Sequence, residues 1–366
     1  MRRRLLGLIV GIAVIGLFTG GQGIRAQDDG DKNLVPITPD NVGQLEQMDT
    51  WEGDESAVTS VEFSRRDPNL IAYGTMAGYT YLGQLDEDTV TQLAYGTGPI
   101  MDVAFNPSGD YLASGRRLSD AMVWSLNPPE IYAVYQRSGS VLSVVFSVDG
   151  STLAFSGSDL IDVSDGEPIP GGGVISLLQP ELGIPVAFQT AERISETTGQ
   201  INSIAYSPNG IHIAAGIGGG NSIESGGRVK IWDVETLAEV AALEGHTGAV
   251  WDVKYDPTGQ YIASASADTT VRLWDTTTGK TVMTFKGHTD EVNAMAFSPD
   301  GTLLASVGSD GTLRFWDVAT GEQVSLIDLT NGGANPVWDI DFSADGTMVA
   351  TASEDGFVRL WAVKGE

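Results

Sequence analysis

Residues 249–264 have the sequence AVWDVKYDPTGQYIAS, and residues 270–285 continue the pattern as TVRLWDTTTGKTVMTF. Apolar and polar side chains alternate over Ala249–Tyr255, which predicts a strand with one buried face. The DPTG sequence of Asp256–Gly259 predicts a tight turn, because glycine adopts the positive φ that such turns require. Three further strands are predicted, at Tyr261–Ser264, Thr270–Asp275 and Thr281–Phe285. The stretch therefore predicts one antiparallel sheet of four strands.

The same pattern occurs seven times between Val58 and Trp361, and an aromatic residue ends the first strand of each repeat. Consecutive aromatic residues are 42, 41, 60, 49, 42 and 45 positions apart. A period of about 40 residues is typical of propellers, in which small sheets stack around an axis because none can bury its own faces. The aromatic residues are Phe63, Phe105, Phe146, Tyr206, Tyr255, Phe297 and Phe342.

The composition fits a large, acidic, folded protein. The chain has 366 residues, of which 42% are apolar, and its 46 glycines and 15 prolines provide for many turns. It has no cysteine, which excludes disulfides, thiolate metal sites and a cysteine nucleophile. The formal net charge of −28 disfavours binding to nucleic acid or anionic lipid, so we expect no nucleic-acid partner.

The first residues are typical of a targeting segment. Arginines at positions 2–4 precede the uncharged apolar run Leu5–Phe18, which is shorter than the roughly 20 residues of a membrane-spanning helix. Ala26 provides a small residue at the expected cleavage point. We therefore predict a signal peptide at residues 1–26 and a secreted or extracytoplasmic protein, in the periplasm or at the cell surface. An uncleaved membrane anchor is the alternative, and residues 27–40 are interpreted as a polar linker.

The repeats predict an all-β, seven-bladed propeller of four-stranded antiparallel blades over residues 41–366. The last repeat has too few residues after Trp361 for an outer strand, and an unpaired edge there would leave the ring open. We expect Gln44–Trp51 to supply that strand and close the ring. The predicted blades span about 57–96, 98–137, 139–190, 200–244, 246–286, 288–330 and 334–364.

Dipeptides at fixed places in the repeats resemble those of the WD-repeat β-propeller family. Gly-His pairs precede two of the predicted first strands, at Gly245-His246 and Gly287-His288. Trp-Asp pairs end three of the third strands, at Trp232-Asp233, Trp274-Asp275 and Trp316-Asp317. The resemblance covers about residues 41–366 and is specific for the fold, whereas it says little about chemistry.

The resemblance also implies a buried hydrogen-bonded set of His, Ser, Asp and Trp within a blade. Two repeats have the required spacing: His246, Ser264, Asp268 and Trp274 form one set, and His288, Ser306, Asp310 and Trp316 form the other. The remaining histidine, His212, falls on a predicted second strand. No histidine is therefore left as a general base, and we expect neither an enzyme nor a cofactor.

One candidate binding site is the rim of the central channel on the narrow face of the ring. In related propellers, the residue after the first apolar residue of each inner strand points to this opening, where partner peptides dock. Shielding of the blade ends is the structural alternative. The seven positions are Thr59, Met101, Leu142, Asn202, Trp251, Asn293 and Trp338.

A second candidate surface is formed by two insertions between second and third strands, at Asp159–Gly173 and Gly216–Gly227. The family architecture implies that both lie on the narrow face, beside Arg116 and Arg117. The first insertion contains four acidic residues that could ligate calcium, although we favour the interpretation that they are solvated turn carboxylates. These residues are Asp159, Asp162, Asp165 and Glu167.

The main functional hypothesis is an exported, monomeric, non-catalytic scaffold that binds a protein or peptide through its narrow face. The alternative is a small-ligand or calcium-binding protein, or an enzyme, that uses the enlarged loops of blades 2–4. A membrane contact is expected only if residues 1–26 are retained.

Overall fold

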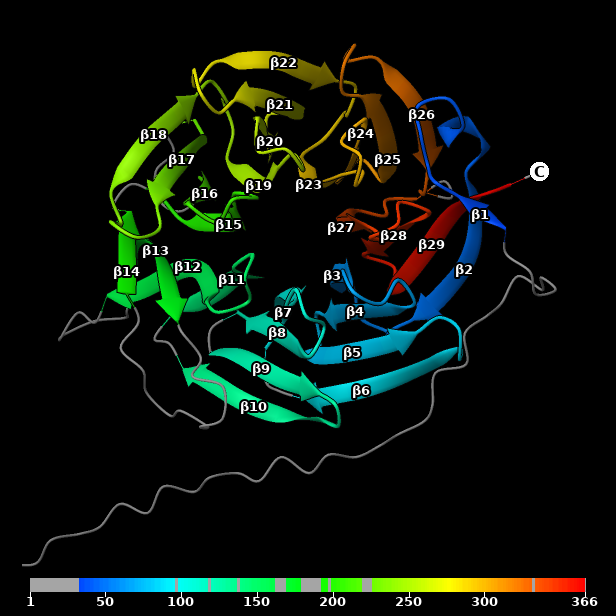
Figure 1. Ribbon diagram of the computed structural model, residues 1–366, viewed down its shortest axis with the longest axis horizontal. Coiled ribbons are helices and arrows are strands. Elements are labelled where there is room, and N and C mark those ends of the chain that lie inside the picture. The colour runs from blue at the N-terminus through cyan, green and yellow to red at the C-terminus, as the bar shows by residue number, and fades with distance from the viewer. Residues whose placement is uncertain are drawn as a thin grey trace, which may run out of the picture.

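Seven antiparallel sheets surround a central opening in the computed structural model of the chain (Figure 1). The structure describes residues 33–95, 98–117, 120–136, 139–161, 169–178, 192–196, 199–218, 226–330 and 333–365. Within these ranges each sheet has four strands from one repeat, except the last, which combines three strands of its own repeat with two from the N-terminal segment. The predicted seven-bladed propeller is confirmed. We number the blades 1 to 7 in chain order.

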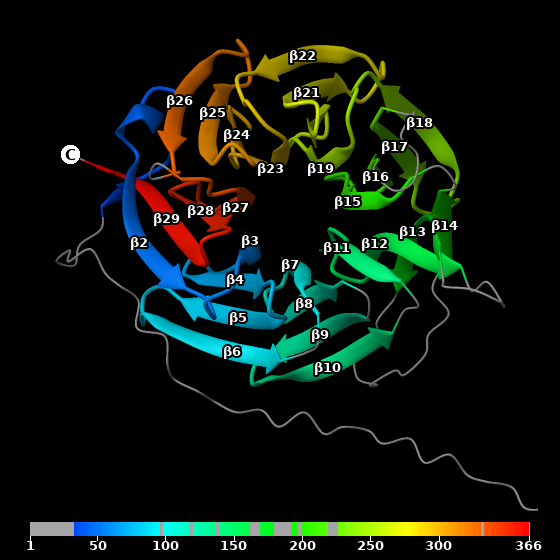
Figure 2. The ribbon, with the colours of Figure 1, turned by 180° about the vertical axis from the view of Figure 1, so that it is seen from behind.

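Each blade begins with an inner strand at the opening, and Figure 2 shows the same inner ring from behind. In six of them the register with the second strand shifts immediately after the first residue, and in β11 it shifts after the second, Val141; each shift is a β-bulge. The sequence pattern does not reveal this shift. The inner strands are β3 (Val58–Phe63), β7 (Ile100–Phe105), β11 (Ser140–Phe146), β15 (Ile201–Tyr206), β19 (Val250–Tyr255), β23 (Val292–Phe297) and β27 (Val337–Phe342).

The second strands are the most deeply buried, because sheets of neighbouring blades cover both of their faces. They are β4 (Leu70–Thr75), β8 (Tyr111–Arg116), β12 (Leu153–Ile161), β16 (His212–Ile217), β20 (Tyr261–Ser266), β24 (Leu303–Gly308) and β28 (Met348–Ser353). The third strands are β5 (Tyr79–Gln84), β9 (Asp120–Leu126), β13 (Ile169–Leu178), β17 (Arg228–Asp233), β21 (Thr270–Asp275), β25 (Thr312–Asp317) and β29 (Phe357–Lys364). The outer strands are β6 (Thr89–Tyr95), β10 (Pro129–Gln136), β14 (Glu192–Glu196), β18 (Glu239–Glu244), β22 (Thr281–Lys286), β26 (Gln323–Asp328) and β2 (Glu46–Glu52).

The turns between first and second strands lie at one end of the channel, which we call the wide face. In blade 5, Gly259 has a φ of 75°, and its N–H donates to the carbonyl of Asp256 at 3.0 Å. The Asp256 carboxylate accepts the N–H of Tyr261 at 2.6 Å, so the side chain fixes the turn from within. The connections between second and third strands and between blades lie at the other end, the narrow face.

The hydrophobic core consists of layers between adjacent blades. Phe285 of β22 packs against Trp316 of β25 in the next blade, with ring centroids 5.5 Å apart, and Met295 belongs to the same cluster. All three side chains are buried. Fully burying an apolar side chain of this kind contributes roughly 1.5–3 kcal/mol, and a blade obtains that burial only from its neighbours.

The ring is closed by strand pairing between distant parts of the chain. Strand β2 lies antiparallel to β29 (Figure 1), with Glu46 opposite Ala362 and Glu52 opposite Phe357. The closing strand predicted at 44–51 is confirmed with bounds shifted by one or two residues. Its Trp51 side chain is only 2% exposed and contacts blade 1, where a β-carbon on Gly83 would lie 2.0 Å from the indole. Gly83 therefore makes room for the closing strand.

The segment before the closing strand contributes to the fold instead of forming a linker from Asn33 onward. Strand β1 (Leu34–Val35) pairs with the end of β29, beyond the residues that pair with β2. Ile37 is 2% exposed and lies in the core cluster of blades 6 and 7, next to the short 3-10 helix η1 (Val42–Gln44). The prediction of a linker was wrong from Asn33 onward. The few apolar residues of this segment are spread among polar ones, so they do not show the alternation that indicates a strand.

The insertion expected as a loop in blade 3 is partly a longer hairpin. Strands β12 and β13 continue to pair at Leu160 with Pro170 and at Ile161 with Ile169. In blade 4, β16 ends at Ile217 and β17 begins at Arg228, and residues 219–225 of that insertion lie outside the described ranges. The predicted signal peptide, residues 1–26, also lies outside them. None of the helices that the structure describes has the length and apolar character of a membrane span.

Candidate binding site in the central channel

A channel of about 1110 Å³ runs along the propeller axis between the inner strands. Its wall includes all seven predicted rim residues, from Thr59 in blade 1 to Trp338 in blade 7. Each of them is the residue at which the inner strand bulges, so none has a directly opposite partner on the second strand. The bulge is the physical reason that these side chains reach the channel mouth. All seven are half-buried.

The two rim tryptophans are held by carboxylates. The indole N–H of Trp251 donates to Glu291 at 2.9 Å, and that of Trp338 donates to Glu354 at 2.8 Å. Three other rim residues instead join blades: Thr59, Asn202 and Asn293 donate to inner-strand carbonyls of the following blade at 2.6, 2.8 and 2.9 Å. The rim therefore combines aromatic side chains in fixed orientations with hydrogen bonds between neighbouring blades.

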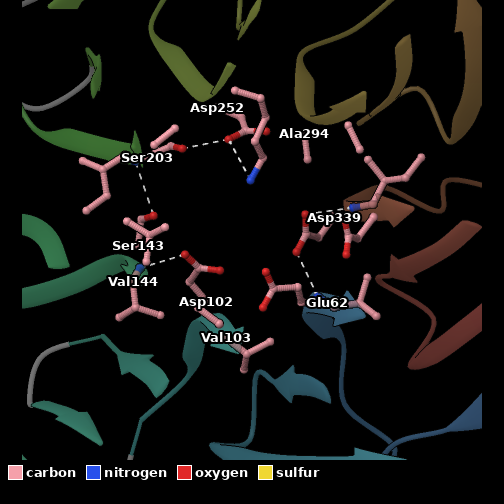
Figure 3. Close-up of a pocket in the computed structure, with 18 of the residues that line it drawn as sticks. Glu62, Asp102, Val103, Ser143, Val144, Ser203, Asp252, Ala294 and Asp339 are labelled. Carbon is pink, nitrogen blue, oxygen red and sulfur yellow. Dashed lines mark hydrogen bonds and ion pairs between the residues drawn. The ribbon is translucent and has the colours of Figure 1, made fainter. Parts of the chain in front are cut away.

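Below the rim, the residue after each bulge forms a second ring, which we call the acceptor ring (Figure 3). Inner strands are sheet edges, so their channel-facing N–H groups have no strand partner and need another acceptor. In six of seven blades, the acceptor-ring side chain accepts an N–H from the inner strand of the following blade. The ring consists of Ser60, Asp102, Ser143, Ser203, Asp252, Ala294 and Asp339, all of which except Ser60 line the channel.

These inter-blade bonds all run in the same sense around the ring. The donors are the N–H groups of Val103 to Ser60 (3.2 Å), Val144 to Asp102 (2.8 Å), Ile204 to Ser143 (3.4 Å), Val253 to Ser203 (3.3 Å), Met295 to Asp252 (3.1 Å) and Val61 to Asp339 (2.9 Å). Ala294 has no acceptor atom, and at that joint Asn293 provides the bond to the carbonyl of Val337. Sequence reasoning missed this ring, because its members share a position but neither size nor charge.

Further charged side chains line the channel on the inner strands of blades 1, 5 and 7, two residues beyond the acceptor ring. Glu62 accepts the N–H of Phe105 at 2.5 Å, and Asp341 accepts that of Phe63 at 2.9 Å. Arg65 pairs with Asp341 at 3.1 Å. Lys254 points into the channel, with its Nζ 3.9 Å from Asp252.

Burial against the channel wall raises the pKa values of three acids, Glu62, Asp339 and Asp102. It raises the pKa of Glu62 to about 8, although Arg65 opposes the shift. It raises the pKa of Asp339 to about 7 and that of Asp102 to about 6, with Lys254 opposing in both cases. The nearby Asp252 in turn raises the pKa of Lys254, which stays cationic. The channel is therefore an acidic compartment whose charge changes near neutral pH.

The structure brings together both of the structural hydrogen-bond sets that the sequence indicates. In blade 5, His246 Nδ1 bonds Asp268 at 2.8 Å, His246 Nε2 bonds Ser264 at 2.8 Å, and the Trp274 N–H donates to Ser264 at 2.7 Å. Since the carboxylate only accepts, Nδ1 carries the proton and Nε2 accepts from the serine. Burial opposes ionisation of Asp268, yet bonds from His246 and Thr270 hold its pKa below the usual range.

Blade 6 repeats the arrangement with the same polarity. His288 bonds Asp310 at 3.0 Å and Ser306 at 2.8 Å, and the Trp316 N–H donates to Ser306 at 2.9 Å. Both histidines are buried and fully engaged, which leaves them unsuited to act as general bases.

Blade 7 uses asparagine where the histidine is missing. The Asn335 amide donates to Asp355 at 3.0 Å and accepts the Asp355 N–H at 3.1 Å, while Trp361 donates to Thr351 at 3.2 Å. Blade 2 retains only the serine and the tryptophan of the set, at Ser114 and Trp124. Within the described residues, neither the Ser114 hydroxyl nor the Trp124 indole N–H has a hydrogen-bond partner, and both are buried.

The second candidate surface is not assembled as expected. Arg116 is only 8% exposed and forms a buried ion pair with Asp120 at 2.6 Å, so it is not available at the surface, whereas Arg117 is exposed. The sequence did not show this burial, because the pair spans a turn whose fold is not evident from its composition. Of the calcium candidates, Asp159 lies in β12, and Asp162, Asp165 and Glu167 fall outside the described residues. Among residues that are described, no group of three His, Asp or Glu side chains could hold a metal ion.

Comparisons with known proteins agree with this geometry. A model of the WD domain, G-beta repeat, matches residues 88–125, and a model of the IFT122 first beta-propeller matches residues 200–366. The chain is a WD-repeat β-propeller. The first match begins one residue before β6 and ends in β9, so one sequence repeat of this propeller spans the outer strand of one blade and three strands of the next.

Curated relatives of this WD-repeat propeller match over part of their length. Protein HIR1 of Cryptococcus neoformans var. neoformans serotype D is 30% identical over 185 residues, which is 47% of this chain and 20% of that protein. Transcription initiation factor TFIID subunit 5 of Caenorhabditis elegans is 29% identical over 170 residues, 46% of this chain and 22% of that protein. Chromatin assembly factor 1 subunit FAS2 homolog of Oryza sativa subsp. japonica is 29% identical over 182 residues, 47% and 32% respectively. The chain thus spans between a fifth and a third of the length of these relatives.

Proposed function

We propose that this propeller is a non-catalytic scaffold that binds a protein or peptide partner at the narrow-face mouth of its channel. The observation that carries the proposal is the convergence of seven bulge residues on one mouth, with two tryptophans oriented there by Glu291 and Glu354. Oriented aromatic side chains at the edge of a cavity are favoured positions for binding energy.

Two further points support a scaffold over an enzyme. The buried histidines His246 and His288 are engaged in structural hydrogen bonds, and the channel carboxylates already hold neighbouring backbone N–H groups. The names of two relatives describe subunits of larger assemblies, which fits a role in protein interaction. We extend this to a monomeric propeller with a protein or peptide partner and without a nucleic-acid partner.

The proposal includes export from the cytoplasm, which rests on the pattern of residues 1–26 alone. Intact-mass analysis of the protein purified from its native cells tests it. A mature chain beginning at Gln27 in an extracytoplasmic fraction is expected, and a full-length chain in the cytoplasm would overturn this part of the proposal.

The binding proposal is tested by affinity capture from native extracts with the wild type and the double variant Trp251→Ala/Trp338→Ala. Val240→Ala/Val282→Ala is the matched control, because these side chains are about half exposed on outer strands far from the channel. Partners retained by the control and lost by the tryptophan variant are expected. Equal capture by both variants would refute the narrow-face mouth as the binding site.

A further inference from the structure

The channel wall carries a marked excess of negative charge. Among the described residues that line it, seven side chains are carboxylic acids and three are bases, Arg65, Arg117 and Lys254. The bases offset only part of this excess. Arg65 lies in the wide-face turn of blade 1 and is paired with Asp341. The Lys254 ammonium lies 3.9 Å from Asp252 and opposes the raised pKa values of Asp102 and Asp339, so one base stands against the three acids of the acceptor ring. Arg117 belongs to blade 2, away from the tryptophans of blades 5 and 7.

We infer that the partner inserts a basic side chain, lysine or arginine, into the narrow-face mouth of the channel. This inference rests on the proposed function and specifies the partner's chemistry. The acids nearest the mouth are Asp102, Asp252 and Asp339 of the acceptor ring, and the rim adds Glu291 and Glu354. A side chain entering there meets carboxylates on several sides, so charge complementarity selects a cation.

The rim tryptophans fit the same occupant. Each indole N–H is bound to a glutamate, so the edge of the ring is engaged while the apolar rim residues around it are only half-buried. Arginine and lysine carry long apolar stems that pack on aromatic rings, and their cationic ends are attracted to ring faces. A stem at Trp251 or Trp338 with its cationic end toward Asp339 or Asp102 would satisfy both parts of the mouth.

The spread of the charges favours an extended organic cation over a metal ion. A metal needs several ligands around one point, and no group of three acidic or histidine side chains among the described residues could provide this. The acceptor-ring carboxylates come from different blades and each is engaged by a neighbouring strand. A guanidinium or alkylammonium group can instead bond one or two of them with its separate N–H donors.

The inference predicts how binding depends on pH. Asp339 faces Lys254, Asp102 and Asp252, and Glu62 faces Arg65, Asp341 and Asp102. Burial, with a smaller contribution from the like charges, raises the pKa values of Asp339 and Glu62 to about 7 and about 8. A bound cation favours their ionised forms, so binding releases protons. The affinity for a basic peptide should therefore rise as the pH increases from about 5.5 to 8, a range in which lysine and arginine stay charged.

The test is selection of a displayed random 12-residue peptide library on the full chain, followed by synthesis of the recovered peptides. Each peptide is compared with a neutral analogue in which arginine is replaced by citrulline or lysine by norleucine. The protein variant Asp102→Asn/Asp339→Asn removes two charges but keeps an oxygen acceptor for the N–H groups of Val144 and Val61. Its control, Glu87→Gln/Glu235→Gln, removes two charges from exposed turns at the wide-face end.

Enrichment in lysine or arginine is expected, with about tenfold weaker binding for the neutral analogues and for Asp102→Asn/Asp339→Asn, and no change in the control. On the wild type, raising NaCl from about 50 to 500 mM should weaken binding, which tests the charge term even if the asparagine variant does not fold. Peptides that need Trp251 and Trp338 but bind independently of basic residues and salt would overturn this inference and leave the proposed function intact. Peptides that need neither tryptophan, or no recovered peptide, would overturn both.

Discussion

Replacing Ser264 by alanine should destabilise the protein by several kcal/mol, because one hydroxyl oxygen connects two buried groups. It accepts the Trp274 N–H at 2.7 Å and bonds His246 Nε2 at 2.8 Å, and the two side chains are 1% and 5% exposed. Each buried polar group left without a partner costs roughly 1–3 kcal/mol, so the two together cost about 2–6 kcal/mol. Urea unfolding followed by tryptophan fluorescence measures the change in the free energy of unfolding.

The chain provides a matched control for this substitution in blade 2. Ser114 occupies the same position relative to Trp124, ten residues later, yet neither polar atom has a hydrogen-bond partner within the described residues. Ser114→Ala removes a buried hydroxyl that makes no bond, so it should be neutral or stabilise by up to about 1 kcal/mol. If Ser264→Ala and Ser114→Ala change the free energy of unfolding equally, the hydrogen-bonded set does not contribute as described.

Three further outcomes are expected. Gly83→Ala places a β-carbon against the indole of Trp51 and should lower the melting temperature measured by calorimetry. Adding Trp51→Leu to Gly83→Ala should restore part of that loss. If the two substitutions instead lower the melting temperature additively, the contact is contradicted. Because burial raises the pKa of Glu62 from 4.5 to about 8, its contribution to the free energy of unfolding is complete below about 4.5 and is lost as the pH rises through about 8. The loss of stability between pH 5 and 9 in urea unfolding should thus be smaller for Glu62→Gln, and an unchanged slope would refute the shift. Deleting residues 33–52 exposes the edge of β29 and should produce oligomers in light scattering, while a stable monomer would show that closure is dispensable.

Much of the architecture was predictable from the sequence because each repeat carries its own local signals. The alternation over Ala249–Tyr255, the glycine at 259 and the strand at Thr270–Asp275 all recur in the structure within a residue or two. The missing outer strand after Trp361 predicted a donor elsewhere, and β2 provides it. These features depend on contacts close in sequence or on the requirement that every sheet edge find a partner.

The remainder depends on contacts between repeats, which a single repeat does not encode. The bulge after Val250 shifts the register by one residue, and its effect on Trp251 is visible only once the second strand is placed. The acceptor ring escaped detection because Asp102, Ser143 and Ala294 share only a position around the axis. Asn335 was missed because the position that aligns with His246 and His288 of the other blades is Gly333, two residues earlier.

Closure of the ring by β2 and β29 imposes an order on biosynthesis. Residues 46–52 emerge from the ribosome about 310 residues before 357–364, a delay on the order of 15 to 60 s at usual rates of translation. Throughout that interval residues 46–52 have no strand partner, and the unfinished polypeptide is available to chaperones or to a translocation machine. Commitment to the native state therefore waits until synthesis is almost complete.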